Sequence, residues 1–245
     1  VPHSTTNQQV QVIMTQTTRP APAPRPQRKN IEAVAVLDMS GSMSSVAQQT
    51  IAGFNAYLDE LKKLPHNIFV TLVLFDDRYI KQYVSQPAAK CPPLTSAEYV
   101  PRGGTALRDA LCQTVADVWE AVRTKPHRTD RVSIFLSTDG QENASQKIRT
   151  DAEAKGAVEL MIKNNHWEFL FAGANMDAHA AGTALGFHPS RIVNIAGDGL
   201  AQGHGLRFLL LAHLEGTRIE QRRQLAQPRK LGVALVLWVD KVLDL

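Results

Sequence analysis

The chain has 245 residues, of which 44% are hydrophobic, and its formal net charge is +4 at pH 7. This length suits one large α/β domain or two small ones, and the apolar content is sufficient for a substantial core. No run approaches 18 consecutive apolar residues, so the sequence predicts no membrane span. The first residues do not resemble a signal peptide, and two cysteines (Cys91 and Cys112) form no disulfide framework. We therefore expect a reducing, cytoplasmic compartment.

The positive charge is concentrated at the two ends of the chain. Residues 1–30 contain four Lys/Arg and no acid, and residues 200–245 contain seven Lys/Arg against four Asp/Glu. The middle of the chain is therefore acidic. The N-terminal cations have no aromatic residues among them, as a stacking surface for single-stranded nucleic acid would require. We expect neither a nucleic acid nor a membrane as the partner.

Composition divides the chain into three zones. Residues 1–30 are polar and include "RPAPAPRPQRK" (Arg19–Lys29), whose alternating prolines favour extended polyproline II, so we expect a disordered arm. Residues 31–196 form the body. Residues 197–245 have helical potential but do not extend the pattern of the body, which leaves a native tail and a frameshifted end both open. Whether Val1 or Met14 is the true start also remains open.

Strand and helix patterns alternate through the body. Four short apolar runs are typical of strands buried on both faces: Glu32–Asp38, Ile68–Phe75, Arg131–Ser137 and Trp167–Gly173. Helical spacing of apolar residues covers residues 51–61, 107–122, 150–164 and 176–185. Two more strands are expected at Arg78–Val84, as an edge hairpin, and at Arg191–Ala196. The order predicts a doubly wound, mostly parallel α/β sheet with helices on both faces and one antiparallel edge strand.

Oxygen-bearing side chains follow the strand ends at which such a sheet binds its ligands. Asp38 ends the first strand and is followed by Ser40 and Ser42, Thr105 follows a Gly-Gly pair, and Asp139 follows the third core strand. These two carboxylates and three hydroxyls are hard donors, and none is a His or Cys. The set favours Mg²⁺, with Mn²⁺ as a second suitable ion, over zinc or copper.

Three further acids also follow predicted strands of the body. Asp77 or Glu142 could complete a metal's shell from within the chain, and Asp76 at the end of the second strand could be another contact. We prefer to interpret Asp77 and Glu142 as solvated loop charges, and Asp76 as part of a capped turn before the hairpin.

The pattern resembles the von Willebrand factor A domain with a metal-ion-dependent adhesion site (MIDAS). Asp38-x-Ser40-x-Ser42 matches its first motif, Thr105 its lone threonine and Asp139 its second aspartate, at intervals of 67 and 34 residues between Asp38, Thr105 and Asp139. The resemblance covers roughly residues 31–195. Stretches such as "GGTALRDAL" and "WEFLFAGANMDA" are similar to a bacterial and phage branch of this family.

The resemblance implies a Rossmann-like fold and a Mg²⁺ ion held by these five residues. It also implies a protein partner whose Asp or Glu completes the ion's shell. In the family's ligand-bound state the threonine hydroxyl, here that of Thr105, approaches the ion, while the second aspartate, here Asp139, steps back to a water-mediated role.

Binding is expected at this site in preference to catalysis. Only two of the five side chains are charged, so the ion keeps most of its positive charge and an open position. A nucleophile elbow needs Gly-x-Ser-x-Gly, which neither Ser40 nor Ser42 satisfies. We expect a non-enzymatic, Mg²⁺-dependent protein-binding module. The alternative is a substrate-presenting regulatory subunit of a chelatase-like or remodelling ATPase complex, and a metal-dependent hydrolase is the weakest interpretation.

Removal of residues 1–30 should leave the melting temperature nearly unchanged, because this segment has too little apolar surface to offset the entropy lost on ordering it. Thermal unfolding of the full and shortened chains measures the effect. A drop of more than a few degrees would show that the arm packs on the body.

Overall fold

The structure, a computed structural model, describes residues 28–174 and 176–195. Our expectations for residues 1–27 and for the C-terminal zone, 197–245, therefore fall outside the described residues.

A six-stranded sheet forms the centre of the molecule. Its strands are β1 (Asn30–Asp38), β2 (Asn67–Phe75), β3 (Tyr79–Pro87), β4 (Arg131–Thr138), β5 (Glu168–Ala174) and β6 (Ile192–Ile195). They lie in the order β3-β2-β1-β4-β5-β6, and every neighbouring pair is parallel except β2 with β3. The expected mostly parallel sheet with one antiparallel edge strand is confirmed.

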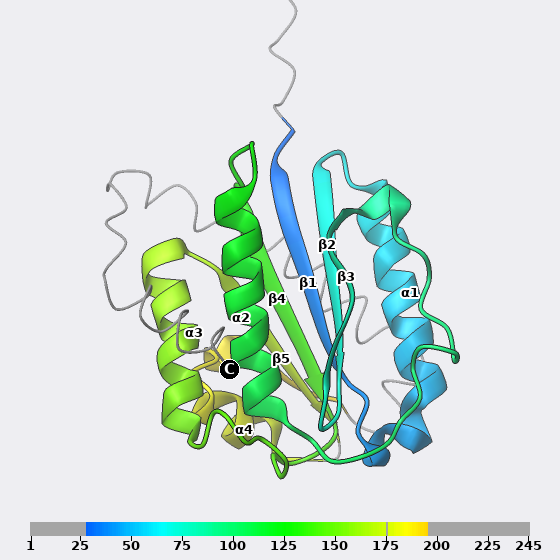
Figure 1. Ribbon diagram of the computed structural model, residues 1–245, viewed down its shortest axis with the longest axis vertical. Coiled ribbons are helices and arrows are strands. Elements are labelled where there is room, and N and C mark those ends of the chain that lie inside the picture. Colours follow the sequence, from blue (N-terminus) through cyan, green and yellow to red (C-terminus); the bar gives the residue numbers. More distant parts are fainter. Residues whose placement is uncertain (1–27, 175, 196–245) are drawn as a thin grey trace, which may run out of the picture.

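Helices cover both faces of this sheet, as Figure 1 shows, with α1 on one side and α2, α3 and α4 on the other. These helices are α1 (Ala47–Lys63), α2 (Leu107–Thr124), α3 (Asp151–Asn165) and α4 (Ala178–Ala184), with short 3-10 helices at Gly41–Val46, Ala88–Lys90 and Pro189–Arg191. Side chains alternate across β1 because a strand repeats every two residues: Val36 lies in the apolar layer beneath α2, and Leu37 lies in the layer beneath α1. None of the helices in the described ranges is long and apolar enough to cross a membrane.

The direction of strand addition reverses between β1 and β4. The chain runs outward from β1 to β3, returns through α2, and adds β4 on the other side of β1. Leu37 of β1 pairs with Ser137 of β4, so the carboxyl ends of these two strands are adjacent. Ligands of open parallel sheets bind at such a reversal, which places a candidate site at the lower edge of the sheet in Figure 1.

The start of β1 is already bonded to the body. The Asn30 N–H donates to Asp130 Oδ2 at 2.9 Å, and the Lys29 carbonyl accepts from the Asn67 N–H at 2.9 Å. A deletion that tests only the arm should therefore end at residue 27.

Candidate metal centre

The Asp38 carboxylate lies fully buried where β1 ends. Its Oδ1 accepts the Ser40 backbone N–H at 2.7 Å, and its Oδ2 accepts the Thr138 hydroxyl at 2.5 Å. Burial raises the pKa of the Asp38 carboxyl above its ordinary value, although these hydrogen bonds act in the opposite direction. Within the described ranges Asp38 forms no ion pair with a Lys or Arg. A cation at this carboxylate would offset the cost of its burial.

The two predicted serines connect Asp38 to the predicted second aspartate. Ser40 Oγ lies 3.1 Å from Ser42 Oγ, and the Ser42 hydroxyl donates to Asp139 Oδ1 at 2.6 Å. Ser44, the third serine of the alternating series, donates instead to the Gly41 carbonyl at 2.7 Å. The Ser42 hydroxyl therefore joins the loop after β1 to the loop after β4, and the Ser40 hydroxyl lies against it.

Thr105 reaches the same place from a third segment. A methyl group on the Cα of Gly140 would lie 3.0 Å from Thr105 Oγ1, 3.4 Å from Ser42 Oγ and 3.9 Å from Asp38 Oδ2. Oxygen atoms from two segments, the end of β1 with its loop and the segment before α2, thus lie within 4 Å of one point beside Gly140. Thr105 does not cap α2, whose N-cap is Ala106.

The candidate site has a buried floor and an accessible rim. Asp38, Ser40 and Thr105 are at most 2% exposed, whereas Asp139 is half-buried and Ser42 is exposed. An ion bound among these oxygens would therefore be reachable from solvent on one side. This arrangement allows a ligand from another molecule to approach.

The other acids near the site are engaged within the fold. Asp76 is fully buried and pairs with Arg78 Nη2 at 2.8 Å and with Arg102 Nε at 2.9 Å. Glu142 accepts hydrogen bonds from the backbone of the loop that follows it and from the start of α2. Asp77 is 55% exposed and lies 4.0 Å from Arg102. Asp77 is thus solvated as preferred, and Asp76 accepts the Arg78 N–H at 2.6 Å as in the preferred capped turn. Glu142 differs from the preferred interpretation, because its side chain is only 14% exposed and is bonded within the fold.

Sequence reasoning missed three residues that hold the site together. Thr138 binds the carboxylate of Asp38, the Tyr99 hydroxyl donates to the Asp38 carbonyl, and Asn143 Oδ1 accepts the Thr105 N–H at 2.8 Å. Thr138 immediately precedes Asp139, so its position at the strand end was a usable signal. Nothing in the sequence marks Tyr99, which is 61 residues from Asp38.

The donor set fits a hard divalent cation. All five side chains offer oxygen, and in the described part of the chain no three His, Cys, Asp or Glu residues gather into a group that could hold a metal. Hydroxyls must therefore supply part of any coordination shell here. Oxygen donors of this kind suit Mg²⁺ or Mn²⁺ better than they suit zinc or copper.

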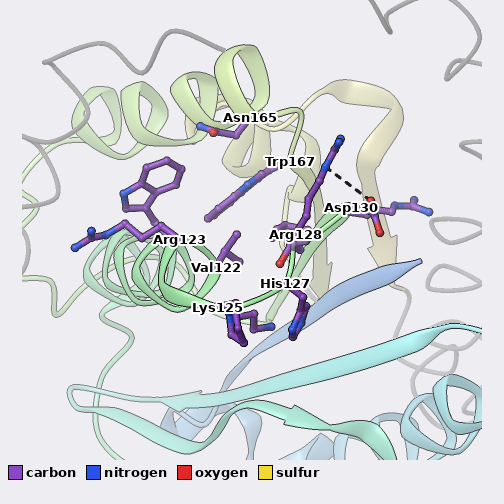
Figure 2. Close-up of a pocket in the computed structure, with 13 residues that line it drawn as sticks. Val122, Arg123, Lys125, His127, Arg128, Asp130, Asn165 and Trp167 are labelled. Atoms are coloured by element: carbon purple, nitrogen blue, oxygen red, sulfur yellow. Dashed lines mark ion pairs between the residues drawn. The ribbon is translucent and has the colours of Figure 1, made fainter. Parts of the chain in front are cut away.

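A hollow of about 330 Å³ lies at the opposite end of the sheet, between the end of α2 and the start of β4 (Figure 2). Two tryptophans, Trp119 and Trp167, contribute to its wall. Its basic residues are paired with carboxylates: Arg128 with Asp130 at 3.9 Å, as the dashed line shows, and Arg123, Lys125 and Arg131 with Glu120, Glu32 and Glu168. The hollow therefore offers little uncompensated charge, and Asp38 remains the better candidate for ion binding.

Known structures share this fold. The chain is 18% identical to a von Willebrand factor type A protein from Catenulispora acidiphila, with a TM-score of 0.54 over 75% of this chain and 42% of that one. It is 18% identical to proximal thread matrix protein 1 from the mussel byssus, with a zinc-occupied MIDAS motif, at a TM-score of 0.51 over 76% and 46% of the two chains. The vWF domain of the type V pili tip protein from Porphyromonas gingivalis is 11% identical, with a TM-score of 0.53 over 84% and 99%.

The described domain therefore has the von Willebrand factor A fold. The chain spans less than half the length of the first two of these proteins. No protein-family model matches the sequence, and no curated protein matches it.

Thr138→Val should destabilise the metal-free protein by about 1–3 kcal/mol, because the buried Asp38 carboxylate loses a donor while the side chain keeps its shape. Urea unfolding in the presence of a chelator measures the loss. Thr124→Val is the matched control, because the Thr124 hydroxyl bonds only to exposed carbonyls of its own helix. Equal losses in the two variants would contradict the role assigned to Thr138.

Proposed function

We propose that this protein is a divalent-metal-dependent protein-binding module. In this proposal Asp38, Ser40, Ser42, Thr105 and Asp139 hold a Mg²⁺ ion, and an Asp or Glu of a partner protein completes its shell. The observation that carries the proposal is the convergence of Thr105, Ser42 and Asp38 oxygens within 3.9 Å of one point beside Gly140.

The electrostatics of the site support a bound cation. Asp38 is buried, and no cationic side chain among the described residues pairs with it; Asp139 nearby raises the pKa of the Asp38 carboxyl further. A divalent ion between the two carboxylates would replace this repulsion by attraction. The neighbour with a zinc-occupied MIDAS motif supports a metal in this fold. The oxygen donors of this chain are the reason to propose Mg²⁺ here.

The charge balance of the site supports a carboxylate ligand from outside. Two carboxylates neutralise a divalent ion only in a formal sense, because serine and threonine hydroxyls donate weakly and the ion keeps much of its Lewis acidity. The exposed rim at Ser42 gives a partner access. Asp76 and Glu142 already have partners in the fold, so a carboxylate of a second protein is the proposed last ligand.

Magnesium or manganese should raise the melting temperature of the wild type. A hundredfold excess over the dissociation constant corresponds to about 2.7 kcal/mol of stabilisation. Asp38→Ala should abolish this response. Unlike most substitutions in the core, it should not destabilise the metal-free protein, because it removes a repulsive buried charge. Calorimetric scans with and without MgCl₂ test this. A variant that gains as much from Mg²⁺ as the wild type would show that the metal lies elsewhere.

Thr105→Ala should weaken binding of the protein partner by at least about tenfold, or roughly 1.4 kcal/mol, and should reduce Mg²⁺ stabilisation less than Asp38→Ala, which abolishes it. Capture of the partner from a host lysate, with Mg²⁺ or with chelator, supplies the ligand for this titration.

The same partner allows a test of the metal bridge itself. A change of its critical Asp or Glu to the amide should cause no further loss in the Asp38→Ala background, because both changes act through one ion. Full and independent losses would rule out a metal-bridged contact. Capture of an ATPase would instead favour the remodelling-complex alternative. The free, buried Cys91 and Cys112 suit the cytoplasmic location that we propose for the encounter.

A further inference from the structure

The backbone of Thr105 is bonded on both sides to a single short stretch of the loop after β4. Its N–H donates to Asn143 Oδ1 at 2.8 Å, and its carbonyl accepts the N–H of Asn143 at 3.1 Å and that of Ala144 at 3.2 Å. Asn143 lies only four residues after Asp139, on the same loop. The threonine and the second aspartate of the candidate site are thus connected through Asn143.

Close packing at Gly104 reinforces this connection. A Cβ at residue 104 would lie 2.8 Å from Asn143 Oδ1 and 3.0 Å from the Ala144 Cβ. The backbone of Gly104 therefore approaches the Asn143 side chain so closely that a side chain at residue 104 would clash with it. Of the two glycines, Gly104 is the one that lies against the loop after β4, whereas Gly103 lies against Asp77.

The same loop is also fastened to the first turn of α2, which begins two residues after Thr105. The Glu142 carboxylate accepts the N–H groups of Arg108, Ala144 and Ser145 at 2.7–2.9 Å. The Asp109 carboxylate accepts N–H groups from residues 146–148, the shortest from Ile148 at 2.7 Å. The segment that carries Thr105 and the loop that carries Asp139 therefore form one bonded unit.

The two serines belong to a different unit. Ser40 and Ser42 follow β1 directly, and the Ser40 N–H is bonded to Asp38 itself. Their polar contact with the unit described above includes the bond from the Ser42 hydroxyl to Asp139. The candidate ligands thus come in two groups whose relative position is set by the loops.

We propose that Asn143 is a positioning residue of the metal centre. Its Oδ1 holds the Thr105 backbone in register with the Asp139 loop, so that the threonine hydroxyl and the second carboxylate are presented to the ion together. This inference rests on the proposed metal-binding function. Asn143 itself is exposed, so its side chain acts on the site through the Thr105 N–H and not as part of the core.

The test measures the dissociation constant of Mg²⁺ for the full chain by calorimetric titration. Asn143→Ala removes the acceptor and should weaken Mg²⁺ binding by about tenfold, as expected when the groups that orient metal ligands are lost. Asn143→Asp keeps an acceptor oxygen at the same place and should bind Mg²⁺ no more than about threefold more weakly than the wild type. Retained affinity in this conservative variant is not expected from a general loss of loop structure.

Asn55→Ala is the matched control. Asn55 Oδ1 accepts the Leu94 N–H at 2.7 Å and joins α1 to a loop, so this substitution removes the same kind of bond. It should lower the melting temperature without changing the Mg²⁺ affinity. An equal loss of affinity in Asn55→Ala and Asn143→Ala would overturn the proposal, as would unchanged affinity in Asn143→Ala.

A double-substitution cycle identifies the route of action. In a Thr105→Ala background, Asn143→Ala should cause no further loss, because the hydroxyl that Asn143 positions is already gone. Additive losses would overturn the proposal. Asp38→Ala in the same series separates the two hypotheses: Mg²⁺ binding that survives this change defeats the metal site itself. Its loss, together with unchanged affinity in Asn143→Ala, defeats only the positioning role.

Discussion

The burial of the Asp38 carboxylate at the end of the central strand is the constraint on which the site depends. A carboxylate without solvent must be hydrogen-bonded, and here the donors are the Ser40 N–H and the Thr138 hydroxyl. Thr138 ends the neighbouring strand, and Tyr99 bonds to the Asp38 carbonyl from the segment that leads toward Thr105. Hydrogen bonds to this one residue thus join the ends of β1 and β4 and a distant loop.

A second buried carboxylate on the same strand shows what is distinctive about Asp38. Glu32, near the start of β1, is also fully buried, but it pairs with Lys125 and accepts hydroxyls from Thr71 and Ser85. Its charge is therefore compensated within the fold. Among the described residues, Asp38 has hydroxyl and N–H donors but no cationic side chain as its partner. The two buried charges of β1 are thus stabilised differently: Glu32 is paired with a lysine, whereas the site at Asp38 suits a bound cation.

The loops around this space differ in how they are held. The serines are fixed by their short distance from β1, whereas Thr105 depends on bonds to residues 143 and 144 and on the fastening of that loop to α2. Arg102 and Gly103 also contact the loop after β1, through the Met39 carbonyl and the Gly41 N–H. A site built from separate segments in this way can hold an ion on a rigid strand end while its rim remains accessible to another molecule.

The sequence by itself determined the sheet, its helices and the five candidate ligands. Buried parallel strands have continuous apolar sequences. Asp38, Ser40, Ser42 and Asp139 end or follow such runs, so the local pattern alone predicts that they lie at one edge of the sheet. Only the tertiary structure decided that Ser44 turns back to Gly41, that Asp76 and Glu142 are used internally, and that Thr138, Tyr99 and Asn143 hold the ligand segments. The bonds of Thr138, Tyr99 and Asn143 join residues 38 to 100 positions apart and depend on how loops fold against one another, about which strand and helix periodicity carries no information.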